Sequence, residues 1–459
     1  MLKKLIGTRQ FYKNIIVLTI PILIQNGITN FVNMLDNLMI GQVGQTEMIG
    51  VSVANQLIFV YNLSIFGAVS GAGIFGAQFF GNNDHKGLRD SFRFKIIFCT
   101  LITAGVIALF YFCGPVLIEM YLRGEGTQEA AQASLDAGYA YLKIMLIGLI
   151  PSTLAQCWSS TLRETGQTLP PMFAGVSAVI VNLILNYILI FGHFGAPAMG
   201  VRGAAIATVM SRFVELFIVA VWTFADRKRN IFIVGAFRSL KVPVSLVKKI
   251  TVKGIPLMIN ETLWAAGVAF VNGCYSTKGL EVVAANNIVQ TFFNVFSVAF
   301  MAVGVAIGIV LGQLLGAGKE AEAKDASLKL IVFSVFVSII VAITFAVSAF
   351  FIPDFYKVSE SVRELATKMM IICALAIPFD AVANACYFTL RSGGEAMITI
   401  VFDCGFAWVV SAATAFVLTS FTSLPILPVF AICQGLNFLK DIIGIYFVKK
   451  GKWIKRIVG

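Results

Sequence analysis

Twelve apolar segments, each long enough to cross a lipid bilayer, constrain this chain more than any other feature of its sequence. An α-helix rises about 1.5 Å per residue, so roughly 20 apolar residues span the ~30 Å hydrocarbon core of a membrane. Only 13% of the residues are charged, whereas soluble domains carry about 25%. We therefore predict an all-α integral membrane protein with 12 transmembrane helices. The predicted spans cover residues 15–40, 49–80, 94–117, 138–161, 169–192, 199–224, 250–273, 282–313, 327–352, 367–390, 396–421 and 425–448.

The distribution of Lys and Arg predicts which side of the membrane each connection faces. Basic residues cluster at 86–95, 227–253 and 449–456, all on one side, whereas the connection 118–136 on the other side is mostly acidic. Connections rich in Lys and Arg stay in the cytoplasm. We therefore predict a multi-pass cell-membrane protein with both termini cytoplasmic. The apolar segment that begins at Ile15 is too long for a cleaved signal peptide, and we interpret it as the first span.

The two halves of the chain repeat one another. Six spans separate equivalent positions, and because six is even, both halves cross the membrane in the same sense, as a parallel pseudo-two-fold repeat. We predict an N-terminal lobe at 1–225, a cytoplasmic linker at 226–249 and a C-terminal lobe at 250–459, with six helices in each lobe. The matched residues are Pro21 and Pro256, Gly73 and Gly308, Gln78 and Gln313, Gly81 and Gly316, Asp90 and Asp325, Pro151 and Pro378, Arg163 and Arg391, and Gly166 and Gly394.

Acidic residues inside the predicted spans are the strongest candidates for function. A charge at the centre of a spanning helix costs about 2.5–3.5 kcal/mol, and such residues usually mark ion or substrate pathways. The main in-span bases that can offset them are Arg212 and Lys440. The in-span acids that we single out on this ground are Asp36, Glu261, Asp380 and Asp403.

One group of polar residues falls in the outer half of the first lobe. Asp36 lies about 6 Å from the outer end of its span, and Asn182 and Asn186 lie about 15 and 9 Å from the outer end of theirs. Thr208 lies about 13 Å into the next span. Carboxylate, amide and hydroxyl oxygens suit Na⁺, and a carboxylate can instead take a proton. The alternatives are a solvated Asp36, asparagines that only join helices, and a threonine used in packing.

A second group falls in the second lobe. Glu261 and Asp380 have depths that let them meet, and Asp403 has a similar depth. We interpret Glu261 and Asp380 as candidates for ion or substrate coupling. The alternative for each of these acids is a structural pair with Arg or Lys.

No motif for catalysis, nucleotide binding or nucleic-acid binding is present. HExxH, GxSxG and the P-loop pattern are absent, so we predict neither an enzyme nor a resident cofactor. His85 and His193 are too far apart in the sequence to predict a paired metal site. The basic residues form short connections rather than a patch, which argues against nucleic acid as a partner. A transporter of this kind would draw on an ion gradient or on the membrane potential, about 2.3 kcal/mol per charge per 100 mV.

Several strings resemble the multidrug and toxic compound extrusion (MATE) transporters. The most specific runs from Asn182 to Thr208, NLILNYILIFGHFGAPAMGVRGAAIAT, and others are MLDNLMIG around Asp36, IPLMINETLW around Glu261, and Asp380 followed by Arg391. The resemblance covers nearly the whole chain. It implies a V-shaped bacterial antiporter that alternates between outward-open and inward-open states.

In that family an Asp on the first helix joins polar residues of the fifth and sixth helices in a Na⁺ or H⁺ site. The matching residues here are Asp36, Asn182, Asn186 and Thr208. Some members carry Asp where this chain has Asn186, and some carry Tyr where it has Ala376.

The resemblance implies export of organic, mostly cationic compounds in exchange for Na⁺ or H⁺, by a protein that works as a monomer in the lipid bilayer. One alternative is a lipid-linked saccharide flippase of the same superfamily, which would line its cleft with Arg and Lys. A second alternative is a channel or membrane scaffold, which would need no lobe-to-lobe repeat.

Overall fold

The computed structural model describes residues 7–122, 128–356 and 358–458. Within these residues the regular structure is helical and contains no β-strand. The described part contains twelve helices that are long and apolar enough to cross a membrane, so the predicted fold class is confirmed. Residues 1–6, 123–127, 357 and 459 lie outside the described part. They include both chain ends that were predicted to be cytoplasmic, and a piece of the acidic connection.

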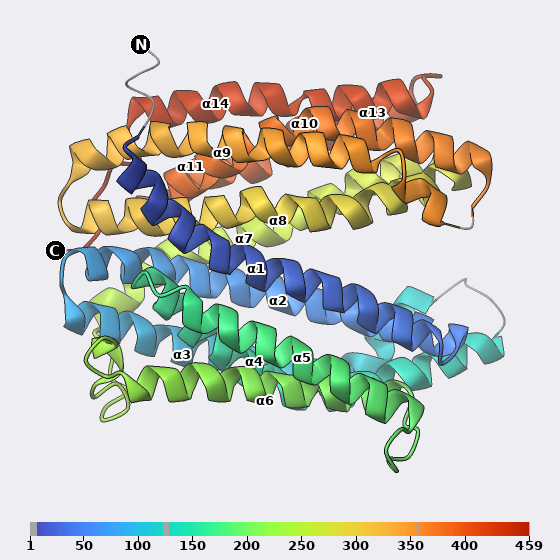
Figure 1. The fold of residues 1–459 in the computed structure, drawn as a ribbon, viewed down its shortest axis with the longest axis horizontal. Coiled ribbons are helices and arrows are strands. Elements are labelled where there is room, and N and C mark those ends of the chain that lie inside the picture. Colours follow the sequence, from blue (N-terminus) through green and yellow to red (C-terminus); the bar gives the residue numbers. More distant parts are fainter. Residues whose placement is uncertain (1–6, 123–127, 357, 459) are drawn as a thin grey trace. The chain divides into compact units, whose positions relative to one another are not determined.

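The helices of the first half extend beyond their apolar segments. α3 begins at His85 and α4 at Gln128, ahead of the starts predicted at 94 and 138, because polar residues can continue a helix into the water outside the bilayer. A short 3₁₀ turn, η2 (Ile231–Ile233), follows in the connection to the second half. The six helices in chain order (Figure 1) are α1 (Arg9–Gly41), α2 (Gln45–Gly81), α3 (His85–Leu122), α4 (Gln128–Glu164), α5 (Leu169–Phe191) and α6 (Val201–Ala225).

The second half matches this order, but its last two spans are interrupted. The eleventh span, predicted as one helix, consists of α11 (Ala396–Ile400), two π-helical turns, η4 (Val401–Gly405) and η5 (Ala407–Ala412), and α12 (Ala413–Ser420). The twelfth is split into α13 (Ile426–Gly435) and α14 (Asn437–Lys450). The uninterrupted helices are α7 (Val244–Ser276), α8 (Leu280–Gly316), α9 (Glu320–Ser348) and α10 (Glu360–Ser392), with the 3₁₀ turn η3 (Ile352–Phe355) before α10.

The chain divides into two compact units. The first unit comprises Ile24–Gly76 and Asp84–Thr251, and the second unit comprises Met1–Leu23, Ala77–Asn83 and Val252–Gly459. The start of α1 and the end of α2 therefore group with the second half of the sequence. The lobe boundaries at 225 and 250 remain a prediction.

Close helix contacts in the first unit depend on small residues. α4 packs on both α3 and α6, and α5 packs on α6. α2 and α4 meet where Gly50 faces Gly138, and a side chain on either glycine would collide with the backbone of the opposite helix. Membrane helices use such residues because lipid gives them no hydrophobic driving force for association, so close packing must supply it.

In the second unit the predicted repeat is visible as a reciprocal contact. A side chain at Gly81 would collide with the carbonyl of Gln313, and one at Gly316 would collide with the carbonyl of Gln78. These are two of the residue pairs matched in the sequence. A two-fold relation produces such reciprocal contacts, because each glycine then lies against the glutamine of the other half.

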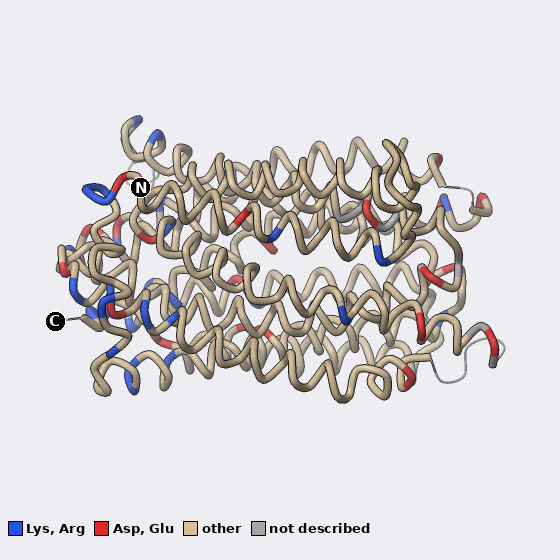
Figure 2. The backbone as a smooth tube through the Cα atoms, turned by 90° about the horizontal axis from the view of Figure 1, so that it is seen from below, with Lys and Arg blue, Asp and Glu red and all other residues tan. Residues whose placement is uncertain are grey.

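Charge is distributed unevenly along the helices of each unit. Figure 2 shows Lys and Arg gathered near one end of the helices, with few charged residues along their middle parts. This is the pattern of a chain whose helix middles lie in hydrocarbon. The cytoplasmic assignment of the basic end remains a prediction.

Candidate functional site

The polar residues predicted from the first half converge in the first unit. Asn186 donates from Nδ2 to Oδ1 of Asp36 at 2.6 Å, which joins α5 to α1. Asn182, one turn earlier on α5, lies 3.2 Å from the Thr208 hydroxyl on α6. Asn182 and Asn186 are 5% and 1% exposed, while Asp36 and Thr208 are half-buried. Three helices thus bring one carboxylate, two amides and one hydroxyl together.

The hydrogen bonds of the Asn182 amide depend on which of its two ends faces Asp36. One end of this amide lies 3.0 and 3.1 Å from the two Asp36 carboxylate oxygens. If that end is nitrogen, it donates to the bare carboxylate, and the amide oxygen accepts from Thr208. If that end is oxygen, two acceptors face each other, an arrangement that needs a proton or a metal cation between them.

Asp36 has no ion-pair partner among the described residues. Arg212, which the sequence offered as a nearby base, instead pairs with Glu215 at 2.9 Å along its own helix. An acid that is held by neutral amides inside a membrane span, with no ion-pair partner, can take a proton or bind a cation.

Glu261 in the second unit takes a basic partner. The Tyr387 hydroxyl donates to Glu261 at 2.5 Å, and Arg391 lies 3.4 Å from the same carboxylate oxygen. Arg391 is 5% exposed. This is the structural pairing that the sequence left open as the alternative for Glu261, and it joins α7 to α10.

Asp380 lies in a different environment from Glu261. Its carboxylate accepts a hydrogen bond from Asn437 on α14 at 2.7 Å, and no hydrogen bond or ion pair joins it to Glu261 within the described residues. Asp441 stands one turn after Asn437, is 5% exposed, and has one carboxylate oxygen with no hydrogen-bond partner in the described part of the chain. Asp380 therefore belongs with α14 rather than with Glu261.

Asp403 has the most complete set of partners of the second-unit acids. Lys440 donates to one of its oxygens at 2.7 Å and Asn260 to the other at 3.0 Å. Asp403 sits in the π-helical turn η4. Such turns often occur at functional sites.

Some polar residues of the spans were missed by the sequence reasoning. Asp441 and Asn437 lie in the predicted twelfth span, and their four-residue spacing is the same signal that singled out Asn182 and Asn186. A further buried ion pair joins Lys95 of α3 to Glu164 of α4. Both residues fall at the predicted edges of spans, where charge is ordinary, so the sequence carried no sign of their burial.

The fold and these sites define the class: a twelve-span helical membrane protein with carboxylates held inside its spans. The MatE family model matches residues 21–188 and 256–417. The chain belongs to the MatE family, which confirms the resemblance to the MATE transporters. The two matched segments begin at Pro21 and Pro256, a pair already identified by the internal repeat.

Named relatives span nearly the whole chain. The probable multidrug resistance protein NorM of Thermotoga maritima is 27% identical over 453 residues, 97% of this chain and 94% of that protein. The probable multidrug resistance protein YoeA of Bacillus subtilis is 23% identical over 452 residues, 97% of this chain and 96% of that protein.

Solved structures share the fold. An outward-facing multidrug resistance MATE family transporter of the MOP superfamily superposes with a TM-score of 0.87 at 18% identity, covering 98% of this chain and 97% of that one. A mutant of the Vibrio cholerae MATE transporter VcmN gives a TM-score of 0.86 at 16% identity, covering 97% and 98%.

Proposed function

We propose that the chain is a secondary active transporter that exports organic, mostly cationic compounds in exchange for Na⁺ or H⁺. Membership of the MatE family and the names of its full-length relatives support export of drugs or toxic compounds. The sequence contains no P-loop, so the energy is expected to come from an ion gradient. One charge moved across 100 mV supplies about 2.3 kcal/mol, sufficient for a roughly fifty-fold concentration ratio.

The observation that carries this proposal is the Asp36 cluster. Its only close polar neighbours among the described residues are neutral amides, and Asn182 has an amide end within reach of both carboxylate oxygens. When Asp36 is bare, the amide nitrogen faces it. When a proton or Na⁺ is bound, the amide oxygen of Asn182 faces Asp36, and the Thr208 hydroxyl no longer donates to that oxygen. Cation binding thereby changes the hydrogen bonds between α1, α5 and α6.

Coupling follows from competition. A ligand shifts a two-state equilibrium only by its difference in affinity for the two states. We propose that the cation bound at Asp36 favours one arrangement of these helices and the organic cargo favours the other. Each full cycle then exchanges one for the other across the membrane.

The second unit is proposed to hold a further coupling site at Asp380. This acid and Asp441 are both close to Asn437, and two carboxylates near one amide suit a cation or a basic group of the cargo. We also propose that Glu261 takes part in coupling, and that its ion pair with Arg391 forms or breaks as the transporter changes state.

The test is efflux of a fluorescent cationic dye from proteoliposomes, driven separately by a Na⁺ gradient and by a pH gradient. We expect Asp36→Asn to abolish efflux under the gradient that drives the wild type, because an amide neither binds a proton nor supplies a charge for Na⁺. Asp380→Asn is expected to lower it at least tenfold.

The matched control is Asp325→Asn, which removes an acid that is 60% exposed beside Lys329. It should transport as the wild type does. Wild-type efflux by Asp36→Asn, at equal protein content in the vesicles, would remove the assigned role of that site.

A further inference from the structure

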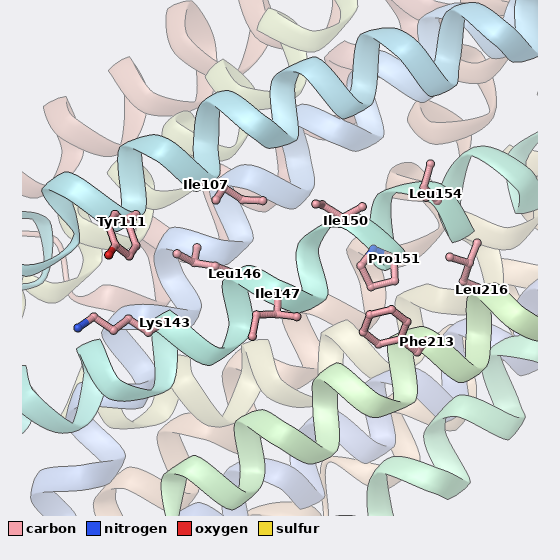
Figure 3. Close-up of a pocket in the computed structure, with 10 residues that line it drawn as sticks. All are labelled: Ile107, Tyr111, Lys143, Leu146, Ile147, Ile150, Pro151, Leu154, Phe213 and Leu216. Atoms are coloured by element: carbon pink, nitrogen blue, oxygen red, sulfur yellow. The ribbon is translucent and has the colours of Figure 1, made fainter.

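The first unit carries a groove on the outside of its helix bundle that the transport site does not use. The groove lies between α3, α4 and α6 and has a volume of about 610 Å³. Most of its lining is apolar, and Pro151 of α4 forms part of it. Figure 3 shows its lining residues, which are Ile107, Tyr111, Lys143, Leu146, Ile147, Ile150, Pro151, Leu154, Phe213 and Leu216.

The walls of this groove face outward rather than into the protein core. Ile147 is 61% exposed, Tyr111 55% and Phe213 47%, each in the middle or outer part of a spanning helix. Apolar side chains exposed on a spanning helix are solvated by lipid chains. A volume of 610 Å³ falls within the roughly 300–1,000 Å³ of small-ligand sites, so the groove can hold a large part of an acyl chain and not only its end.

One end of the groove carries polar groups and the other carries none. Figure 3 places the Lys143 ammonium and the Tyr111 hydroxyl at the same end, with Leu154 and Leu216 at the opposite end. Lys143 lies about 8 Å inside the predicted span 138–161, at the side away from the basic connections. A lysine side chain can extend from that depth to the level of the lipid headgroups.

Lys143 has no carboxylate within 4 Å in the described part of the chain. Its ammonium group lies over the face of the Tyr139 ring, 4.3 Å from the ring centroid. A cation inside a span costs a few kcal/mol unless it is paired, and a ring face offsets only part of this. An anion at the polar end of the groove supplies the missing partner.

From this geometry we infer that the groove is a binding site for an anionic phospholipid. One acyl chain lies along the apolar floor, and the phosphate pairs with Lys143 and accepts a hydrogen bond from Tyr111. A cationic cargo is disfavoured here because Lys143 repels it. The site is therefore separate from the proposed transport function, and its test does not depend on transport.

The experiment measures lipid binding to the purified full chain in detergent by native mass spectrometry, with palmitoyl-oleoyl phosphatidylglycerol or phosphatidylcholine as the probe. The wild type should bind the first phosphatidylglycerol about five times more tightly than phosphatidylcholine, since one basic group near an anionic headgroup contributes about that factor. Lys143→Gln should remove this preference, and Lys143→Arg should retain it. Ile150→Trp, which fills the groove, should weaken binding of both lipids.

The matched control is Lys368→Gln, which removes a lysine that is 52% exposed on α10 and should leave the preference unchanged. Lys143→Gln should remain folded, because it removes an unpaired charge from a span. Equal affinity of the wild type for both lipids would overturn the inference, and so would an unchanged preference in Lys143→Gln. An equal loss in Lys368→Gln would show a general charge effect and would also overturn it, as would unaltered binding by Ile150→Trp.

Discussion

The buried pair between Lys95 and Glu164 gives a prediction whose size can be worked out from its surroundings. The two side chains are 0% and 6% exposed. Lys95 donates to both carboxylate oxygens, and also to the Thr161 hydroxyl at 3.0 Å. Ser160 donates to the carboxylate from one turn earlier on α4. Lys95→Met removes the cation that donates to both carboxylate oxygens and leaves the buried Glu164 carboxylate without that ion pair.

Breaking one side of such a pair costs about 3–5 kcal/mol, whereas replacing both partners by apolar residues of similar volume is often neutral. We therefore expect Lys95→Met to destabilise the protein by about 3–5 kcal/mol and Lys95→Met with Glu164→Met to recover most of that loss. The assay is unfolding of the purified variants in detergent, arranged as a double-mutant cycle.

The control for this cycle is Lys368→Met, whose partner Glu364 is 67% exposed, and it should cost less than about 1 kcal/mol. A loss below about 1 kcal/mol for Lys95→Met, or a double variant less stable than both single ones, would refute the reasoning.

Two further changes test other contacts. Lys440→Met removes the ion partner of Asp403 at 2.7 Å, while the hydrogen bond from Asn260 remains. We expect the free energy of unfolding in detergent to fall by about 3–5 kcal/mol. Wild-type stability would contradict this expectation. Gly393→Ala places a methyl group against the Trp453 carbonyl; we expect a cost of about 1–3 kcal/mol and faster tryptic cleavage of the C-terminal segment, whereas an unchanged cleavage rate would show that this contact adjusts freely.

The two units hold their carboxylates in different ways, and this bears on the division of labour in the proposed exporter. Asp36 accepts a hydrogen bond from the neutral Asn186 amide and forms no ion pair within the described residues, so its charge can change without breaking one. Glu261 and Asp403 each have a cation within 3.4 Å. Asp380 resembles Asp36, because its hydrogen-bond donor is an asparagine. On this basis we propose that Asp36 and Asp380, rather than Glu261 and Asp403, are the carboxylates that exchange a cation.

The sequence by itself determined the spans, the internal repeat and the family. A bilayer of fixed thickness requires each crossing to be a helix of about 20 apolar residues, so the fold class follows from the number and length of the apolar segments in the sequence. The Asp36 group was also predictable, since depth placed its residues in the outer half of the first lobe and the four-residue spacing placed Asn182 and Asn186 on one face of their helix.

Only the tertiary structure decided which partner each remaining acid takes. Depth in a span says nothing about the direction in which a helix is rotated or which neighbour it faces. Glu261 and Asp380 have compatible depths, yet one turns to Arg391 and the other to Asn437. The burial of Lys95 with Glu164 was hidden for the same reason, because charges at the edges of spans are ordinary until packing from neighbouring helices removes the water around them.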